Sequence, residues 1–139
     1  MMADISASHL TIDRLLQATT DHDLETLVAC FAEGYTNETP VHPSRGFHGN
    51  AQVRRNWEQI FALVPDLRAE VKRHAVAGDV VWTEWEMTGT RRDGRAHCMR
   101  GVIIFGVGDG VIQWARFYLE PVDLNGDSVD DAVRAHVMG

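Results

Sequence analysis

The sequence is poor in cysteine: the two it has, Cys30 and Cys98, fall in a segment expected to be helical and in an expected strand. Free thiols are typical of proteins in the reducing cytoplasm, whereas small secreted domains are rich in disulfides. Residues 1–8 also lack a basic region followed by an apolar run, so the sequence gives no sign of a secretory signal. We therefore expect a cytoplasmic protein.

Long apolar runs and an excess of positive charge are missing as well. No stretch approaches the roughly 20 apolar residues that a membrane-spanning helix needs. The net charge is −7, which argues against nucleic acid because binding to phosphates requires a basic surface. We expect neither a membrane nor a nucleic-acid partner. The charge suits a neutral or cationic small molecule.

Motifs for metal, nucleotide and nucleophilic chemistry are absent from the sequence. The seven histidines show no metal-ligand spacing. No glycine-rich loop leads from an expected strand into an expected helix, as a phosphate-binding loop would. Cys98 has no assigned histidine partner that could activate it as a nucleophile. We expect no metal and no cofactor.

The patterns that are present indicate one domain of 139 residues with 45% hydrophobic content. Its core spans about residues 8–122, followed by a tail, 123–139, in which a short helix capped by Ser128 fits the sequence. Apolar residues at helical spacing predict three helices, and alternation predicts five strands. The expected helices are Ser8–Thr19, Leu24–Ala32 and Asn50–Val64. The expected strands are Tyr35–Thr39, Asp66–Ala77 and three more between Val80 and Glu120.

The stretch Val80–Glu120 alternates between an apolar series and a series that mixes charges with aromatic residues. The order of elements and the long antiparallel strands favour an α+β fold. A sheet of strands this long must twist and curl, so helices over its hollow leave a cone-shaped cavity. Such a cavity is the usual place for a small ligand.

The register of these strands depends on the two joints Asp93-Gly94 and Asp109-Gly110. A three-residue loop ending in a left-handed glycine keeps each series on one face, whereas a two-residue turn would mix them. With three-residue loops, Glu86 lies opposite Arg100, and Gly101 lies between Trp85 and Phe117.

The chain resembles the SnoaL-like (polyketide cyclase-like) proteins of the nuclear-transport-factor-2-like superfamily over roughly residues 11–122. Short motifs in a shared order carry the resemblance: His22-Asp23-Leu24, Phe47-His48-Gly49, Val64-Pro65-Asp66, Arg100–Phe105, Asp109-Gly110 and Arg116–Pro121. The resemblance implies a curled antiparallel or mixed sheet with three helices over its concave face. Relatives include enzymes, binding domains and transport adaptors, so the resemblance specifies no reaction.

The catalytic acids of known relatives are missing. Where cyclases, isomerases and epoxide hydrolases of this fold carry charged catalytic residues, this chain has Ile103, Phe117, Trp85 and Met87. Tyr35 and Asn37 match the Tyr-x-Asn of the epoxide hydrolases, which helps to hold a water. They could bind a ligand oxygen here or satisfy local backbone groups.

Glu38 and His42 are the candidate acid and base, because they lie near the expected cavity mouth with Arg45 and His48. A solvated loop is the alternative for this cluster, and a rim position is the alternative for His97. The candidate ligand contacts are the residues expected to face the cavity: Tyr35, Asn37, Trp57, Phe61, Trp85, Met87, His97, Met99, Ile103 and Phe117.

The charged and aromatic series is expected on the opposite face of the sheet. We predict that this face pairs with a second copy of the chain, since solvent alone explains its aromatic residues poorly. An exposed, salt-bridged sheet is the alternative. The predicted dimer face comprises Trp82, Glu84, Glu86, Arg100, Trp114, Arg116, Tyr118 and Glu120.

Two functions remain open at this stage. One is acid–base chemistry without a cofactor on a hydrophobic, oxygenated small molecule, such as cyclisation, isomerisation, dehydration or hydrolysis. The other is a ligand-binding or accessory module that captures such a molecule without turnover. The missing acids favour the second, and the polar cluster at the mouth favours the first.

Overall fold

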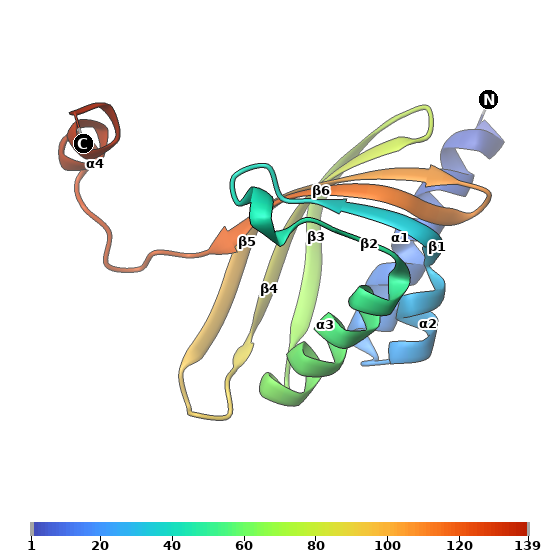
Figure 1. Ribbon diagram of the computed structural model, residues 1–139, viewed down its shortest axis with the longest axis horizontal. Helices are drawn as coiled ribbons and strands as arrows, with labels where there is room; N and C mark the ends of the chain where they lie inside the picture. Colours follow the sequence, from blue (N-terminus) through green and yellow to red (C-terminus); the bar gives the residue numbers. More distant parts are fainter. Residues whose placement is uncertain (1, 139) are drawn as a thin grey trace.

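The fold was examined in a computed structural model, which describes residues 2–138 (Figure 1). Its helices are α1 (Met2–Thr20), α2 (Leu24–Ala29), the short 3-10 helix η1 (Pro43–Arg45), α3 (Asn50–Leu63) and α4 (Val129–Met138). Its strands are β1 (Phe31–Glu38), β2 (Phe47–His48), β3 (Arg68–Ala77), β4 (Val80–Thr90), β5 (Ala96–Gly108) and β6 (Val111–Pro121). None of the described helices is long and apolar enough to cross a membrane.

The strands form one open six-stranded sheet in the order β2-β1-β6-β5-β4-β3. β1 runs parallel to β6, and the other neighbours are antiparallel. Helix α1 packs against β3, β4 and β5, while α2 and α3 pack against β1 (Figure 1). The predicted α+β fold, with helices over the concave face of a curled mixed sheet, is confirmed.

The second helix is shorter than predicted, and the strand after it is longer. Asp23 caps this helix, because its carboxylate accepts a hydrogen bond from the Thr26 backbone N–H at 3.1 Å. The helix ends at Ala29, and the Cys30 carbonyl then accepts a bond from Ile112 in β6 at 2.7 Å. This bond takes the chain into the sheet, so Phe31 is the first residue of β1 rather than part of the helix.

The first joint, between β4 and β5, has the predicted form. Arg91 and Arg95 close a three-residue loop through a 2.8 Å backbone hydrogen bond, and Gly94 ends the loop with φ +86°. Glu86 consequently lies opposite Arg100, as expected.

The second joint differs from the prediction. Gly108 pairs with Val111, so Asp109 and Gly110 form a two-residue turn in which both have positive φ. Such a turn alone would exchange the faces of β6. A bulge between Gly106 and Val107 adds one more residue, so the side chains of β6 return to their predicted faces.

Gly101 has Trp85 on one side, as predicted, but its neighbour on β6 is Leu119 rather than Phe117. The shift follows from the two-residue turn at the second joint together with the bulge between Gly106 and Val107. The φ of Gly101 is +153°, and a Cβ there would overlap the carbonyl of Tyr118. Only glycine lets the strands approach so closely at this point.

The inner face of the sheet forms the core of the domain. Trp85, Ile103 and Phe105 are each at most 2% exposed there. Two hydrogen bonds fix this region: the Trp85 indole N–H donates to Thr83 Oγ1 at 2.6 Å, and the Thr83 hydroxyl donates to the Ile103 carbonyl at 2.7 Å. The buried polar groups therefore satisfy each other.

The tail leaves the body of the domain after β6 and ends in α4 (Figure 1). The Ser128 hydroxyl accepts a hydrogen bond from the Asp131 backbone N–H at 3.2 Å, so it caps α4 as the sequence indicated. Val129, Val133 and Val137 follow one another at helical spacing and are more than half exposed.

Candidate functional site

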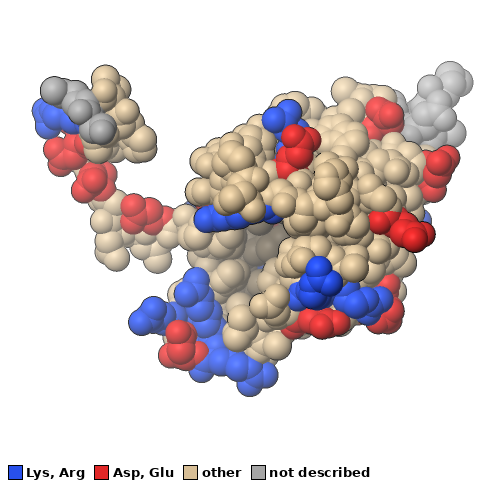
Figure 2. All heavy atoms as spheres, in the orientation of Figure 1, with Lys and Arg blue, Asp and Glu red and all other residues tan. Residues whose placement is uncertain are grey.

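The candidate site is a cavity of about 420 Å³ between α3 and the concave side of the sheet. A hollow is visible in the middle of the molecular face in Figure 2, between α3 and the strands. Sixteen residues line the cavity: Phe31, Tyr35, Asn37, Thr39, Arg45, Phe47, Val53, Asn56, Trp57, Ile60, Met87, His97, Met99, Phe117, Leu119 and Glu120. Most of this lining is apolar, which suits a hydrophobic ligand.

A buried polar pair from β1 faces this cavity. The Tyr35 hydroxyl donates to Asn37 Oδ1 at 2.8 Å, and the two residues are 1% and 8% exposed. Burial raises the pKa of the Tyr35 phenol above its ordinary value, so the phenol stays neutral. Phe31 and Phe47 contact the ring of Tyr35 edge-on, with centroids at 4.8 and 6.0 Å. The pair places amide and hydroxyl groups where a ligand oxygen could bond to them.

Three charged or titratable side chains meet at the mouth of the cavity. His42 Nε2 lies 2.5 Å from Glu120 Oε1, and Arg45 Nη1 lies 4.0 Å from Glu120 Oε2. The side chains of His42 and Glu120 are 32% and 43% exposed, so both reach water as well as each other. A carboxylate paired with an imidazole in this setting can take up and release a proton.

Glu120 lies in a different environment from the one we predicted, which was the outer face of the sheet. The last residue of β1 that pairs with β6 is Glu38, opposite Arg116, so β6 runs on beyond its neighbour. At Glu120, β6 is paired with β5 through Arg100, but its edge toward β1 is open. The loop that carries His42 and Arg45 lies against this open edge, so the Glu120 side chain contacts the loop, which the alternation of faces does not reveal.

Glu38 does not line the cavity. It follows the inward-facing Asn37 in β1, and its neighbour in the register is Arg116 rather than the buried Ala115. The side chain is exposed and belongs to the other face of the sheet. His48 is also exposed, and its Nδ1 lies 3.2 Å from Thr36 Oγ1. Of the two candidate acid–base residues, His42 therefore contacts the carboxylate of Glu120, whereas Glu38 lies on the other face of the sheet.

Most predicted ligand contacts line the cavity, but three do not. Trp85 and Ile103 are 2% exposed and belong to the packed core. Phe61 stacks on the His22 imidazole with centroids 4.3 Å apart. The sequence pattern predicts which residues face inward but not how deeply each is buried. It therefore could not separate these three residues from the cavity lining. The predicted contacts within the lining are Tyr35, Asn37, Trp57, Met87, His97, Met99 and Phe117.

Several lining residues that the sequence did not reveal come from α3 and the loop before it. Asn56 faces the cavity on the same side of α3 as Val53 and Ile60, and Phe47 belongs to the short strand β2, which the sequence pattern did not reveal. Thr39 and Arg45 reach it from the loop after β1. A two-residue strand has too few residues to show alternation, so no periodic signal could have revealed it.

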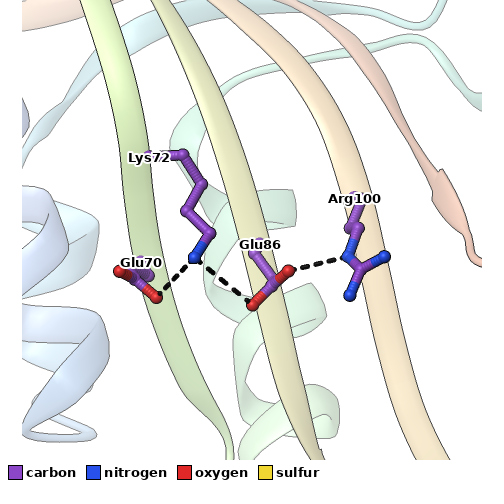
Figure 3. Close-up of polar contacts among 4 residues, drawn as sticks. All are labelled: Glu70, Lys72, Glu86 and Arg100. Atoms are coloured by element: carbon purple, nitrogen blue, oxygen red, sulfur yellow. Dashed lines mark hydrogen bonds and ion pairs between the residues drawn. The ribbon is translucent and has the colours of Figure 1, made fainter.

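The outer face of the sheet carries a row of ion pairs (Figure 3). Glu86 accepts a hydrogen bond from Arg100 Nε at 2.7 Å and lies 3.9 Å from Lys72 Nζ, which also contacts Glu70 at 3.3 Å. Glu86 raises the pKa of Arg100 through this hydrogen bond. The charges of the face are thus largely satisfied within the chain.

Aromatic residues accompany these ion pairs on the outer face. Trp82 is 50% exposed and Tyr118 is 37% exposed. Trp114 covers Gly106, where a Cβ would overlap its indole ring. Arg116 is half-buried, and its Nε has no hydrogen-bond partner among the described residues. Within the same part of the chain, no group of three His, Cys, Asp or Glu side chains could hold a metal ion.

An open curled sheet with helices over its concave side and a cavity between them defines the nuclear-transport-factor-2-like class of α+β proteins. The chain belongs to the SnoaL-like domain family, whose model matches residues 12–116. The predicted membership is confirmed. Among curated proteins, none matches the chain in sequence.

Solved structures with the same fold include enzymes and ligand complexes. An epoxide hydrolase of the LEH-like type from Mycobacterium tuberculosis is 16% identical, with a TM-score of 0.72, over 97% of this chain and 98% of that one. IdmH from Streptomyces antibioticus, a candidate polyketide cyclase, is 24% identical, with a TM-score of 0.70, over 81% and 91%. RV0760c from M. tuberculosis, solved with estradiol-17beta-hemisuccinate, is 18% identical, with a TM-score of 0.70, over 86% and 95%. At these identities, the likeness shows the fold alone.

Proposed function

We propose that this protein binds a hydrophobic, oxygenated small molecule in the cavity between α3 and the sheet. The observation that carries the proposal is the buried Tyr35–Asn37 pair facing a largely apolar lining. Apolar walls favour a hydrophobic body, and the pair offers hydrogen bonds that would orient an oxygen of that body. The steroid ester bound to RV0760c supports this class of ligand, since that protein has the same fold.

Tryptophan fluorescence tests the binding. Trp57 lines the cavity, whereas Trp82 is half exposed on the opposite face of the sheet. We expect a saturable fluorescence change on titration with a steroid, a polyketide-like aromatic or a hydrophobic epoxide. Trp57→Phe should remove most of the change and Trp82→Phe should retain it. A change that persists in Trp57→Phe and disappears in Trp82→Phe would place the ligand elsewhere.

A second proposal is that the cavity supports acid–base chemistry without a cofactor. It is supported by the His42–Glu120 contact at the mouth, where Glu120 itself lines the cavity. The imidazole and the carboxylate could transfer a proton to or from a ligand held by Tyr35 and Asn37. Cyclisation, isomerisation, dehydration and hydrolysis all need such a transfer. The apolar side chains at Ile103 and Phe117 favour the alternative, a non-catalytic binding module.

Two carboxylate variants separate these alternatives. Glu120→Gln removes the carboxylate at the mouth, and Glu38→Gln removes an exposed carboxylate on the other face of the sheet. If the protein is an enzyme, Glu120→Gln and His42→Ala should lower product formation at least tenfold, and Glu38→Gln should not. Binding without product from the wild type across the three ligand classes would establish the binding module instead.

We also propose that the outer face of the sheet pairs with a second copy of the chain. The exposed Trp82 and Tyr118 support this, together with the unpartnered Nε of Arg116. The alternative is a solvated, salt-bridged sheet, which the internal ion pairs of Glu86 support. Sedimentation at micromolar concentration should give a dimer for the wild type and a monomer for Trp82→Glu. A monomeric wild type would rule out the pairing.

We propose a cytoplasmic location, on the basis of the free thiols of Cys30 and Cys98. Fractionation of the source cells tests it. Recovery of the protein outside the cytoplasmic fraction would contradict it.

A further inference from the structure

A second cavity adjoins the candidate site. It has a volume of about 710 Å³ and lies between the C-terminal half of α3 and the hairpin that joins β4 to β5. Asn56, Ile60 and His97 line both cavities. The two spaces therefore meet along these residues, and a ligand longer than the first cavity would extend toward the hairpin.

The hairpin end of this space is basic. Arg91, Arg92 and Arg95 fall within five residues of one another with one acid, Asp93, in a chain whose net charge is −7. Figure 2 shows the basic side chains gathered at the β4–β5 loop, with a single acidic residue among them. Asp93 also lines this space, but it pairs with Arg95, its Oδ2 lying 3.8 Å from Arg95 Nε. Within the part of the chain that the structure describes, Arg91 and Arg92 have no carboxylate within 4.0 Å.

Contacts with the end of α3 hold Arg92 in place. The Arg92 backbone N–H donates to the Leu63 carbonyl at 3.1 Å, and Arg92 Nε donates to the Ala62 carbonyl at 2.5 Å. Arg92 thus caps the C-terminus of α3 and leaves its terminal nitrogens for another acceptor. Arg91 lines the cavity, and its side chain makes no hydrogen bond to the described residues.

The positive charge at the hairpin end of the cavity affects the pKa of His97. Burial lowers the pKa of His97 below its ordinary value, and the positive charge of Arg91 lowers it further. An uncompensated cation beside an apolar cavity favours an anion there.

We infer that Arg91 and Arg92 form a binding site for an anionic end group of an elongated hydrophobic ligand whose body lies in the cavity under α3. A carboxylate, phosphate or sulfonate would meet both guanidinium groups, while apolar residues such as Ile60 and Leu63 contact the adjoining body. The inference rests on the proposed binding function and adds the charge of the ligand to it.

Two fluorescent probes that differ in one charged group test the inference. Anilinonaphthalene sulfonate carries an anionic group, and phenylnaphthylamine has the same hydrophobic body without it. Wild-type protein should bind the sulfonate about fivefold more tightly than the neutral probe, a ratio typical of an exposed ion pair. Arg91→Gln should reduce this preference, and the neutral probe should still bind. Raising the salt concentration should weaken the binding of the sulfonate probe and leave the binding of the neutral probe as it is.

Arg73→Gln is the matched control, because Arg73 is exposed, pairs with Glu84 and does not line the cavity. It should keep the preference for the sulfonate. Equal affinities of the wild type for the two probes, or an unchanged preference in Arg91→Gln, would overturn the inference while the neutral probe still reports the cavity. If neither probe binds, the proposed function itself fails.

Discussion

The imidazole of His42 meets the carboxylate of Glu120 with Nε2 and Oε1 2.5 Å apart, and this contact joins the loop after β1 to the free end of β6. Both side chains are about a third or more exposed to solvent. Ion pairs in this setting stabilise a fold only slightly, because water screens them. A strong effect of either residue on a reaction would therefore reflect chemistry rather than folding.

Glu120→Gln should lower the free energy of unfolding by less than about 1 kcal/mol. Urea unfolding followed by circular dichroism measures this change. Glu38→Gln, on the opposite face, is the control and should change it as little. A loss of several kcal/mol in Glu120→Gln would mean that the contact holds the loop in place, and activity data on the variant would then need a different interpretation.

Thr83→Val should destabilise the core by about 1–3 kcal/mol, because it leaves the Trp85 indole N–H without its acceptor in a buried site. The substitution keeps the shape of the side chain and removes only the hydroxyl. Thr88→Val in the same strand is the control, since the Thr88 hydroxyl makes no hydrogen bond to the described residues. Equal midpoints of urea unfolding for the two variants would contradict this account of the core.

Gly106→Ala should cost about 1–3 kcal/mol, because the added methyl group overlaps the Trp114 indole ring and forces it to move. Gly108→Ala in the same strand is the matched control, since the nearest atom to its new Cβ is the flexible side chain of Gln113 at 3.3 Å. Thermal unfolding of both variants compares the two costs. The prediction fails if Gly108→Ala is the less stable of the two.

The sequence was sufficient to predict the sheet as a set of alternating strands, but not every strand pairing. Glu86 opposite Arg100 followed from an opposite-charge pair and a three-residue loop, both of which are local features. The place of Leu119 beside Gly101 depends on a two-residue turn and a bulge at Gly106. A bulge arises where packing of one strand against its neighbours requires it, and no residue type marks that position uniquely.

The candidate site was predictable in its apolar part and only partly in its polar part. Tyr35 and Asn37 could be recognised through the resemblance, because they match the Tyr-x-Asn of epoxide hydrolases of this fold, and the structure places both toward the cavity. Glu120 could not, since its position depends on how the loop with His42 folds over the end of β6. The place of Arg91 beside a cavity could not be predicted either, because the second cavity forms where α3 approaches a hairpin that is distant in sequence.

His97 should make stability depend on pH below neutrality. Its pKa in the folded protein lies below the ordinary value of 6.5, through burial first and then the charge of Arg91. The folded state therefore favours the neutral ring, and the unfolded chain binds a proton first as the pH falls. The stability that neutral His97 contributes is fully present above pH 6.5 and is lost as the pH falls through the folded-state pKa. His97→Gln should flatten this dependence.

Titration of His97 by nuclear magnetic resonance measures the same effect directly. Removing the nearby positive charge with Arg91→Gln should raise the pKa of His97 toward its ordinary value without restoring it fully, since burial remains the first cause. Arg95→Gln should raise it less, because Arg95 is paired with Asp93. A His97 pKa that is unchanged in Arg91→Gln would show that the guanidinium does not act on this cavity.

The most direct test of the central claim is native mass spectrometry of the protein titrated with a hydrophobic, oxygenated ligand. Leu119→Trp adds bulk to the cavity lining, whereas Tyr118→Trp adds it to the exposed outer face of the same strand. We predict one ligand per chain for the wild type and for Tyr118→Trp, and none for Leu119→Trp. Equal ligand binding by the two tryptophan variants would contradict the assignment of this cavity as the binding site.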